Sequence, residues 1–111
     1  MTRKSTMETG SGNIFADLGL PGAETHLLKA EIVSEIYRLS NARKLTQEQT
    51  GRLLAISQPE VSRLFRGHFS EYSVERLIGF LTNFNRDVEI VVKPQKKSGR
   101  HGKITFTTAV V

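Results

Sequence analysis

Hydrogen-bonding side chains recur on one side of residues 58–66. If this stretch is helical, its apolar residues face inward and Gln58, Ser62, Arg63 and Arg66 are left on the outer face. Amide, hydroxyl and guanidinium groups form hydrogen bonds with base edges in the grooves of DNA, and guanidinium groups also bind phosphate. A short helix with such a face is typical of the element that reads DNA in a helix-turn-helix.

Two capping boxes predict where the helices of this region begin. Thr46 can cap a first helix and is followed three residues later by Gln49, and Ser57 and Glu60 repeat this arrangement before a second helix. Pro59 falls in the first turn of the second helix, where its missing N–H costs nothing. The region therefore contains two short helices joined by a tight turn, as in a helix-turn-helix.

Small residues stand where the two helices of residues 46–67 must cross closely. Gly51 and Ala55 occupy these places, and larger side chains would hold the helices apart. The apolar residues expected to face inward are Ile56, Val61, Leu64 and Phe65. The alternative is an ordinary helical hairpin with a solvated polar face, in which the caps, small residues and apolar spacing coincide by chance.

Residues 43–67 resemble the phage-repressor-like helix-turn-helix family, the Cro/C1 or XRE group. With Gln47 counted as the first position of the motif, the family expects a small fifth residue, an apolar branched fifteenth residue and an apolar eighteenth residue. These are Gly51, Val61 and Leu64. The ninth position, usually glycine, is Ala55, so the turn must be made without a residue that is free at positive φ.

The resemblance implies which residues touch DNA. The residues at the twelfth, thirteenth, sixteenth and seventeenth positions are expected to reach base edges in the major groove: Gln58, Pro59, Ser62 and Arg63. Phosphate contacts are expected from Arg43, Lys44, Gln47 and Arg66, and the helix N-terminus at Gln47 adds its own attraction for phosphate. Alternatively, Arg63 and Arg66 are ordinary surface arginines. Glu60 is expected to cap its helix, and as a base reader it would target cytosine N4.

The length and composition fit one small domain. With 111 residues the chain can bury a modest core, and 38% of its residues are hydrophobic. The absence of cysteine excludes a disulfide scaffold and a thiolate zinc site. No apolar run approaches the roughly 18 residues that span a bilayer, and residues 1–9 lack the apolar core of a signal peptide. We therefore expect a cytoplasmic protein, associated with the nucleoid and with no membrane.

Positive charge is concentrated in two segments of a chain whose formal net charge is +5. Residues 43–68 carry five basic residues against two acids, and residues 93–103 carry five basic residues and no acid. Residues 11–42 and 69–92 each hold four acids against two bases. The excess thus lies on the helices expected to read DNA and on the tail, as a phosphate-binding surface requires.

No set of side chains has the spacing of a catalytic or metal site. His26, His68 and His101 fall on different expected elements, and no Ser/His/Asp or Glu/His combination recurs. We expect no enzymatic activity, no metal and no cofactor.

The chain divides into three parts. Residues 1–12 are polar and are expected to be disordered. Residues 13–86 are expected to form the helix-turn-helix domain, a mainly α, phage-repressor-like bundle of four to five short helices. Residues 87–111 are expected to form a C-terminal β extension with a basic loop.

Apolar spacing predicts the elements around the motif. A short turn at residues 13–21 is expected to dock Phe15 and Leu18 on the core, the longest helix is expected over residues 23–40, and another helix starts after Ser73. The residues expected to face the core on the two helices are Leu27, Leu28, Ile32, Val33, Ile36, Leu39, Val74, Leu77, Ile78 and Leu81.

β-branched residues predict strands at residues 87–93 and 104–111. Because an unpaired strand edge is costly, the two strands form a hairpin, or the first pairs with its symmetry copy in a two-fold dimer, or both occur. The basic loop at residues 95–102 is either a solvating linker or an arm that follows the DNA backbone or enters a minor groove.

The order of elements across residues 13–94 looks like the antitoxins of HigB/HigA-type toxin–antitoxin pairs. It combines a docking segment at 15–20, a helix, the motif, and a β-branched segment at 85–92. The resemblance implies a homodimeric repressor of its own promoter, bound to a double-stranded DNA operator, and leaves open a toxin partner that cleaves RNA. Two rivals stay open. In one, neutralising a toxin is the main task and DNA binding is secondary. The other is an RNA-binding module, which the scarcity of aromatic residues near the basic loop, Phe106 alone, counts against.

Overall fold

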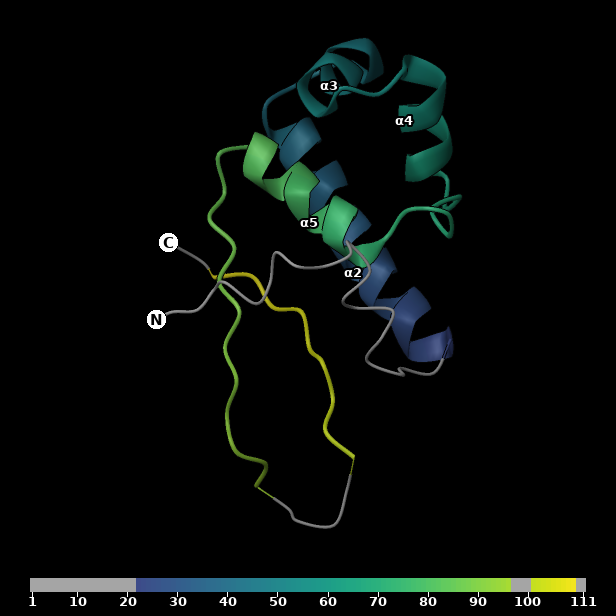
Figure 1. Cartoon of the computed structure of the whole chain (residues 1–111). Helices are drawn as coiled ribbons and strands as arrows, with labels where there is room; N and C mark the ends of the chain where they lie inside the picture. Colours follow the sequence, from purple (N-terminus) through teal and green to yellow (C-terminus); the bar gives the residue numbers. More distant parts are fainter. Residues whose placement is uncertain (1–21, 97–100, 110–111) are drawn as a thin grey trace.

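The computed structural model describes residues 22–96 and 101–109 of the chain. Within these ranges it contains four α-helices, α2 (Gly22–Ala42), α3 (Gln47–Leu54), α4 (Gln58–Phe65) and α5 (Val74–Asn83). Figure 1 shows α5 lying along α2, with α3 and α4 together at one end of this pair. The architecture is mainly helical, as predicted. The disorder expected at residues 1–12 and the docking turn at 13–21 lie outside the described residues.

The long helix α2 presents one stripe of apolar side chains to the core. Leu28, Ile32, Ile36 and Leu39 follow helical spacing and are all buried. Leu27 was predicted to join them, but its side chain is 59% exposed. Each residue turns the helix by about 100°, so Leu27 lies beside the stripe set by Leu28 instead of on it.

The core is closed by side chains from all four helices. The buried apolar residues outside α2 are Leu54, Val61, Leu64, Phe69, Val74, Leu77, Phe80, Leu81 and Phe84. One polar contact lies within the core, where the hydroxyls of Ser40 and Thr50 are 2.7 Å apart. Both residues are buried, so this hydrogen bond satisfies two groups that water cannot reach and fixes α3 against the C-terminal end of α2.

The predicted helix starts of the motif are confirmed by their capping geometry. The Thr46 hydroxyl accepts a hydrogen bond from the Gln49 N–H, and the Gln49 side chain accepts one from the Thr46 N–H, at 3.0 and 2.8 Å. Ser57 and Glu60 form the same reciprocal pair at 3.2 and 2.8 Å. Each box satisfies two backbone N–H groups at a helix N-terminus, so the starts of α3 and α4 are fixed locally.

Gly51 is the point at which the backbones of α3 and the following turn come closest. A Cβ atom at this position would lie 2.6 Å from the carbonyl oxygen of Ile56. The Gly51 carbonyl also accepts a hydrogen bond from the Ile56 N–H at 2.9 Å, so the turn is fastened to α3 at the same place. The small residue predicted here is therefore required by the close approach.

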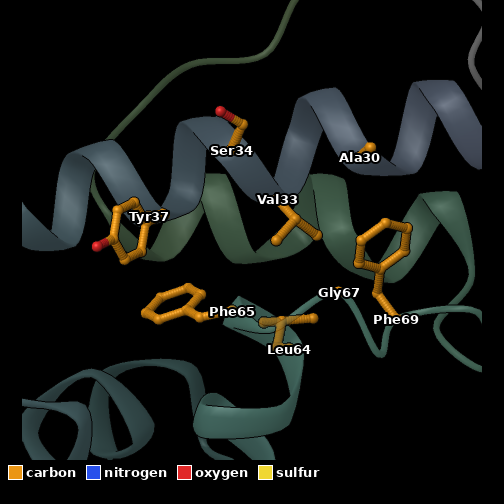
Figure 2. A pocket seen from close by; sticks show the side chains of 8 residues that line it. All are labelled: Ala30, Val33, Ser34, Tyr37, Leu64, Phe65, Gly67 and Phe69. Atoms are coloured by element: carbon orange, nitrogen blue, oxygen red, sulfur yellow. The ribbon is translucent and has the colours of Figure 1, made fainter.

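An open groove of about 330 Å³ separates α2 from the end of α4 and the loop that follows it. Figure 2 shows Val33 of α2 projecting toward Leu64 of α4, with Phe69 near one end of the groove and Tyr37 and Phe65 near the other. The rings of Tyr37 and Phe65 meet edge to face with centroids 5.0 Å apart. Aromatic pairs of this geometry are favourable, so the pair stabilises the junction of α2 and α4 at the surface.

The two strands predicted near the C-terminus are wrong for the described chain. Residues 86–96 and 101–109, the C-terminal arm, run as two long limbs without a strand in either (Figure 1). No backbone hydrogen bond joins the described parts of the limbs, although the Gln95 side chain donates to the His101 carbonyl at 3.0 Å. β-branched residues favour an extended backbone, but a strand also needs a partner for its N–H and C=O groups. The second limb returns to the helices, where Phe106 packs against the core.

Replacing Gly51 by alanine tests the close approach. Gly51→Ala gains helix propensity but forces the Ile56 carbonyl to move, so the free energy of unfolding should fall by roughly 1–3 kcal/mol. The matched control is Gly79→Ala on α5, where an added Cβ meets nothing within 4 Å. This substitution should raise the free energy of unfolding by about 0.5–1 kcal/mol. Urea unfolding of both variants gives the comparison, and equal stabilisation by the two would contradict the close approach.

Candidate DNA-binding surface

The outer face of α4 presents the side chains that were predicted to read bases. Gln58, Pro59 and Arg63 are exposed and Ser62 is half-buried, whereas Val61 on the opposite side of the helix is fully buried. These four side chains therefore lie together on the outer surface of one short helix, toward its N-terminal end. That is the part of a recognition helix that enters a major groove.

A hydrogen bond between two outer side chains joins α4 to α3. The Gln58 Nε2 atom donates to the Gln47 Oε1 atom at 2.7 Å. This contact leaves the Gln58 Oε1 atom and one N–H free, which are the two groups that an adenine edge requires. It also leaves the amide N–H groups of Gln47 free at the N-terminus of α3, where they can donate to a phosphate.

Glu60 is held inside the capping box of α4. Hydrogen bonds from the N–H and hydroxyl of Ser57 lower the pKa of its carboxyl, and the positive charges of Arg76 and Arg63 lower it further. Burial raises the pKa of the Tyr72 hydroxyl beside it, and the Glu60 carboxylate raises that pKa as well. The carboxylate is thus engaged by its own helix, as the predicted capping role requires.

Lys44 and Arg66 are exposed and each follows the end of a helix. Lys44 follows α2 in a left-handed conformation with φ 57°, and its N–H donates to the Asn41 carbonyl at 2.9 Å. Arg66 is the C-cap residue of α4. Both side chains are exposed, so their charges are open to solvent or to a phosphate.

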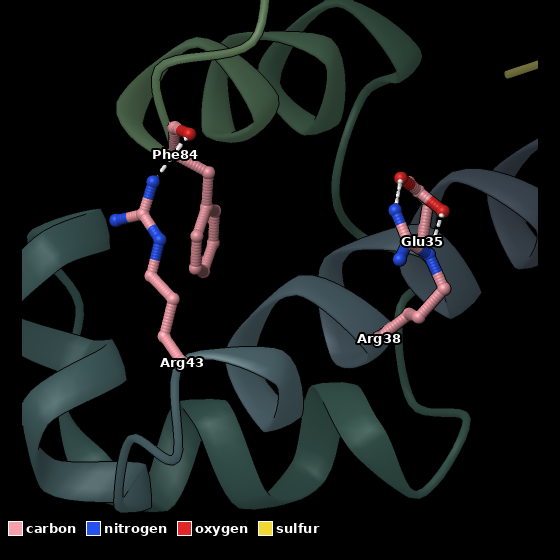
Figure 3. Close-up of polar contacts among 4 residues, drawn as sticks. All are labelled: Glu35, Arg38, Arg43 and Phe84. Atoms are coloured by element: carbon pink, nitrogen blue, oxygen red, sulfur yellow. Dashed lines mark hydrogen bonds and ion pairs between the residues drawn. The ribbon is translucent and has the colours of Figure 1, made fainter. Parts of the chain in front are cut away.

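Arg43 lies elsewhere. Figure 3 shows its guanidinium directed at the C-terminal end of α5, where it donates to the Phe84 carbonyl at 2.6 Å. The guanidinium also lies over the Phe84 ring, 5.2 Å from the centroid. The phosphate contact expected of Arg43 stays a prediction, and the structure gives this side chain another role, because it fastens the turn before α3 to the end of α5.

Among the described residues, no three His, Asp or Glu side chains gather where they could hold a metal ion. In the same part of the chain, none of the helices combines the length and the apolar character that crossing a membrane would take.

Comparison with known proteins identifies the family. A family model described as a helix-turn-helix domain matches residues 14–93. A solved structure described as an XRE-family transcriptional regulator is similar over 80% of this chain and 100% of its own, with 30% sequence identity and a TM-score of 0.75. The chain belongs to the XRE-type helix-turn-helix family. It is a DNA-binding transcriptional regulator, and no curated protein sequence matches it.

The contacts of Arg76 with Tyr72 and Phe80 were not predicted from the sequence. The Arg76 guanidinium lies over the rings of Tyr72 and Phe80, 5.0 and 5.6 Å from their centroids. Its positive charge also lowers the pKa of the Glu60 carboxyl in the capping box of α4. The signal available in the sequence was an arginine with an aromatic residue four positions before it and another four positions after it.

The turn of the motif is made by a strained residue. Ala55 adopts φ 62° and ψ 39°, and its N–H closes the end of α3 by donating to the carbonyls of Gly51 and Arg52. This is the left-handed region, where a Cβ costs an L-residue roughly 1–2 kcal/mol and glycine costs nothing. The regulator thus keeps the family's turn geometry without the family's usual glycine.

Replacing Ala55 by glycine should therefore stabilise the regulator. The free energy gained by removing the Cβ strain exceeds the entropic cost of ordering a more flexible glycine on folding. Ala55→Gly should therefore raise the free energy of unfolding by about 1 kcal/mol. The matched control is Ala30→Gly inside α2, which should lower the free energy of unfolding by about 1 kcal/mol. Thermal unfolding of the two variants is the measurement. A loss of stability in Ala55→Gly would show that the turn does not need positive φ.

Proposed function

We propose that the regulator is a sequence-specific repressor that binds a double-stranded DNA operator as a homodimer. The observation that carries the proposal is the hydrogen bond between Gln47 and Gln58 on the outer surface of the motif. It holds one side chain at the end of α4 that reads bases and another at the end of α3 that binds phosphate, before any DNA is present. Such preorganisation reduces the conformational entropy lost on binding.

In this proposal, Gln58, Pro59, Ser62 and Arg63 reach base edges in the major groove. The amide pair of Gln58 suits adenine, and the guanidinium of Arg63 suits guanine O6 and N7. Phosphates on either side are held by Lys44, Gln47 and Arg66. Arg43 acts mainly by fastening the turn before α3 to the end of α5.

Arg63 and Lys44 test the division between base and phosphate contacts. Arg63→Ala should weaken operator binding by roughly 1–3 kcal/mol and relax the preference at one base pair per half-site. Lys44→Gln should weaken binding evenly across sequences and reduce the slope of log K against log salt by about one. Gel shifts on a randomised operator pool at several salt concentrations measure both effects.

The matched control for these variants is Arg38→Ala. Arg38 is an exposed arginine of α2 that is bound to Glu35 at 2.6 Å, and it is not among the residues proposed to contact DNA. It should leave affinity and sequence preference unchanged. If wild type and Arg63→Ala select the same sequences, Arg63 does not read a base.

The C-terminal arm supports the homodimer. Ile90, Val91 and Val92 are 66%, 67% and 93% exposed, which is unusual for three consecutive β-branched apolar residues. A second copy that covers them removes this surface from water. A dimer also doubles the DNA contacts, which a single domain of this size needs for useful affinity.

A charge placed in this apolar run tests the dimer. Ile90→Lys should lower self-association without melting the helices, because position 90 is remote from the core. Operator affinity should fall together with self-association, because a monomer binds one half-site and a dimer binds two. The two half-sites lie about 34 Å, or a multiple of that, apart on the DNA. Sedimentation and footprinting on one sample measure both quantities, with Ile90→Val as the control that keeps the apolar surface. If Ile90→Lys stays dimeric and protects two half-sites, the interface lies on the helices.

A second candidate function is that of an autoregulating antitoxin that neutralises a toxin protein. The exposed apolar arm favours it, because such a surface also suits a protein partner. Co-purification with the product of a neighbouring gene, followed by a toxicity assay with and without the regulator, tests this role. Neutralisation by a variant that has lost DNA binding would make it the main task.

A further inference from the structure

The arm carries basic side chains directly after its apolar run. Lys93 and Lys96 are exposed and are separated by Pro94 and Gln95. Proline, and the restriction it places on the preceding residue, favour a polyproline II backbone here. That conformation has three residues per turn and rises about 3.1 Å per residue, so Lys93 and Lys96 would project from the same side about 9 Å apart.

The outward face of α2 carries the complementary pattern. Glu24, Leu27 and Glu31 follow each other at intervals of three and four residues, so they share one face of the helix, and all three are exposed. No ion pair joins either glutamate to another residue within the described ranges. At about 1.5 Å per residue the two glutamates lie about 10 Å apart along the helix, with an apolar residue between them.

The two patterns match in charge, spacing and apolar centre. Two lysines about 9 Å apart flank a proline on the arm, and two glutamates about 10 Å apart flank a leucine on α2. The Leu27 side chain is 59% exposed and lies outside the core. A partner that covers it would bury apolar surface that the single chain leaves in water.

The arm and this face do not meet within one copy. In Figure 1, residues 88–96 run away from the helices on one side of α5, while the N-terminal half of α2 lies on the other side of the molecule. The arm's start is also held, because Arg43 binds the Phe84 carbonyl immediately before it. The complementary surfaces are therefore available to different copies of the chain.

We infer that in the dimer each copy lays its arm across the outward face of α2 of the other copy. Lys93 and Lys96 pair with Glu24 and Glu31, Pro94 covers Leu27, and the apolar run before them extends the contact. The inference rests on the proposed homodimer and names its receiving surface. Two-fold symmetry repeats the contact, so four ion pairs form in one dimer.

Charge exchange tests this arrangement. One variant carries Lys93→Glu and Lys96→Glu, and a second carries Glu24→Lys and Glu31→Lys. Each alone places like charges at both contacts of its homodimer, so self-association should weaken by about tenfold or more at low salt. An equimolar mixture of the two restores opposite charges at both contacts, so it should associate with about wild-type affinity. Sedimentation equilibrium at low and high salt measures these affinities.

Glu75→Lys is the matched control, because Glu75 is an exposed acid on a different helix, in the first turn of α5. It should associate as the wild type does, and circular dichroism should show that all variants keep their helices. Wild-type association by either charge-reversed variant alone, or failure of the mixture to recover, overturns the inference. In either event, a wild type that still selects one DNA sequence keeps the DNA-binding proposal intact, whereas a wild type that selects no DNA sequence overturns the proposed function itself.

Discussion

The approach of Gly51 to the Ile56 carbonyl sets the geometry on which the rest of the motif depends. Because a Cβ there would lie 2.6 Å from that oxygen, the chain after α3 turns back more tightly than any other residue would allow. The tight turn brings Ser57 to the place where α4 starts, and α4 then buries Val61 and Leu64 and leaves the other side of the helix outward. The orientation of the outer face of α4, the face proposed to meet DNA, is therefore a consequence of one backbone contact.

Side chains that reach across the fold extend this constraint from the motif to the end of α5. Asn83 donates to the Leu53 carbonyl at 3.0 Å, and Arg43 donates to the Phe84 carbonyl at 2.6 Å. The first contact joins the C-terminal end of α5 to α3 itself, and the second joins it to the turn before α3. The arm that leaves at residue 86 thus starts from a point whose position relative to α3 and α4 is fixed, although the arm itself is exposed.

Local chemistry explains which features could be predicted from sequence. The capping boxes and the small residue at Gly51 involve partners within a few residues, so their pattern is visible in the chain. Leu27 was placed wrongly because helical spacing alone does not decide between neighbours such as Leu27 and Leu28. The strands were wrong because β-branched residues indicate an extended backbone and say nothing about a bonding partner. The contact between Arg43 and Phe84 joins residues 41 positions apart, which no local pattern reveals.

Among the described residues, three other than glycine adopt the left-handed conformation after a helix: Lys44 follows α2, Ala55 ends α3 and Asn85 follows α5. Asparagine tolerates that conformation, and Lys44 contributes a charge near the motif that glycine would remove. Ala55 neither tolerates this conformation as asparagine does nor contributes a charge. Every alanine codon becomes a glycine codon by one nucleotide change, so the more stable form is a single mutational step away. That alanine is kept here fits selection that maintains enough stability for function without maximising it. Ala55→Gly is therefore a single substitution that could compensate for destabilising mutations elsewhere in the chain.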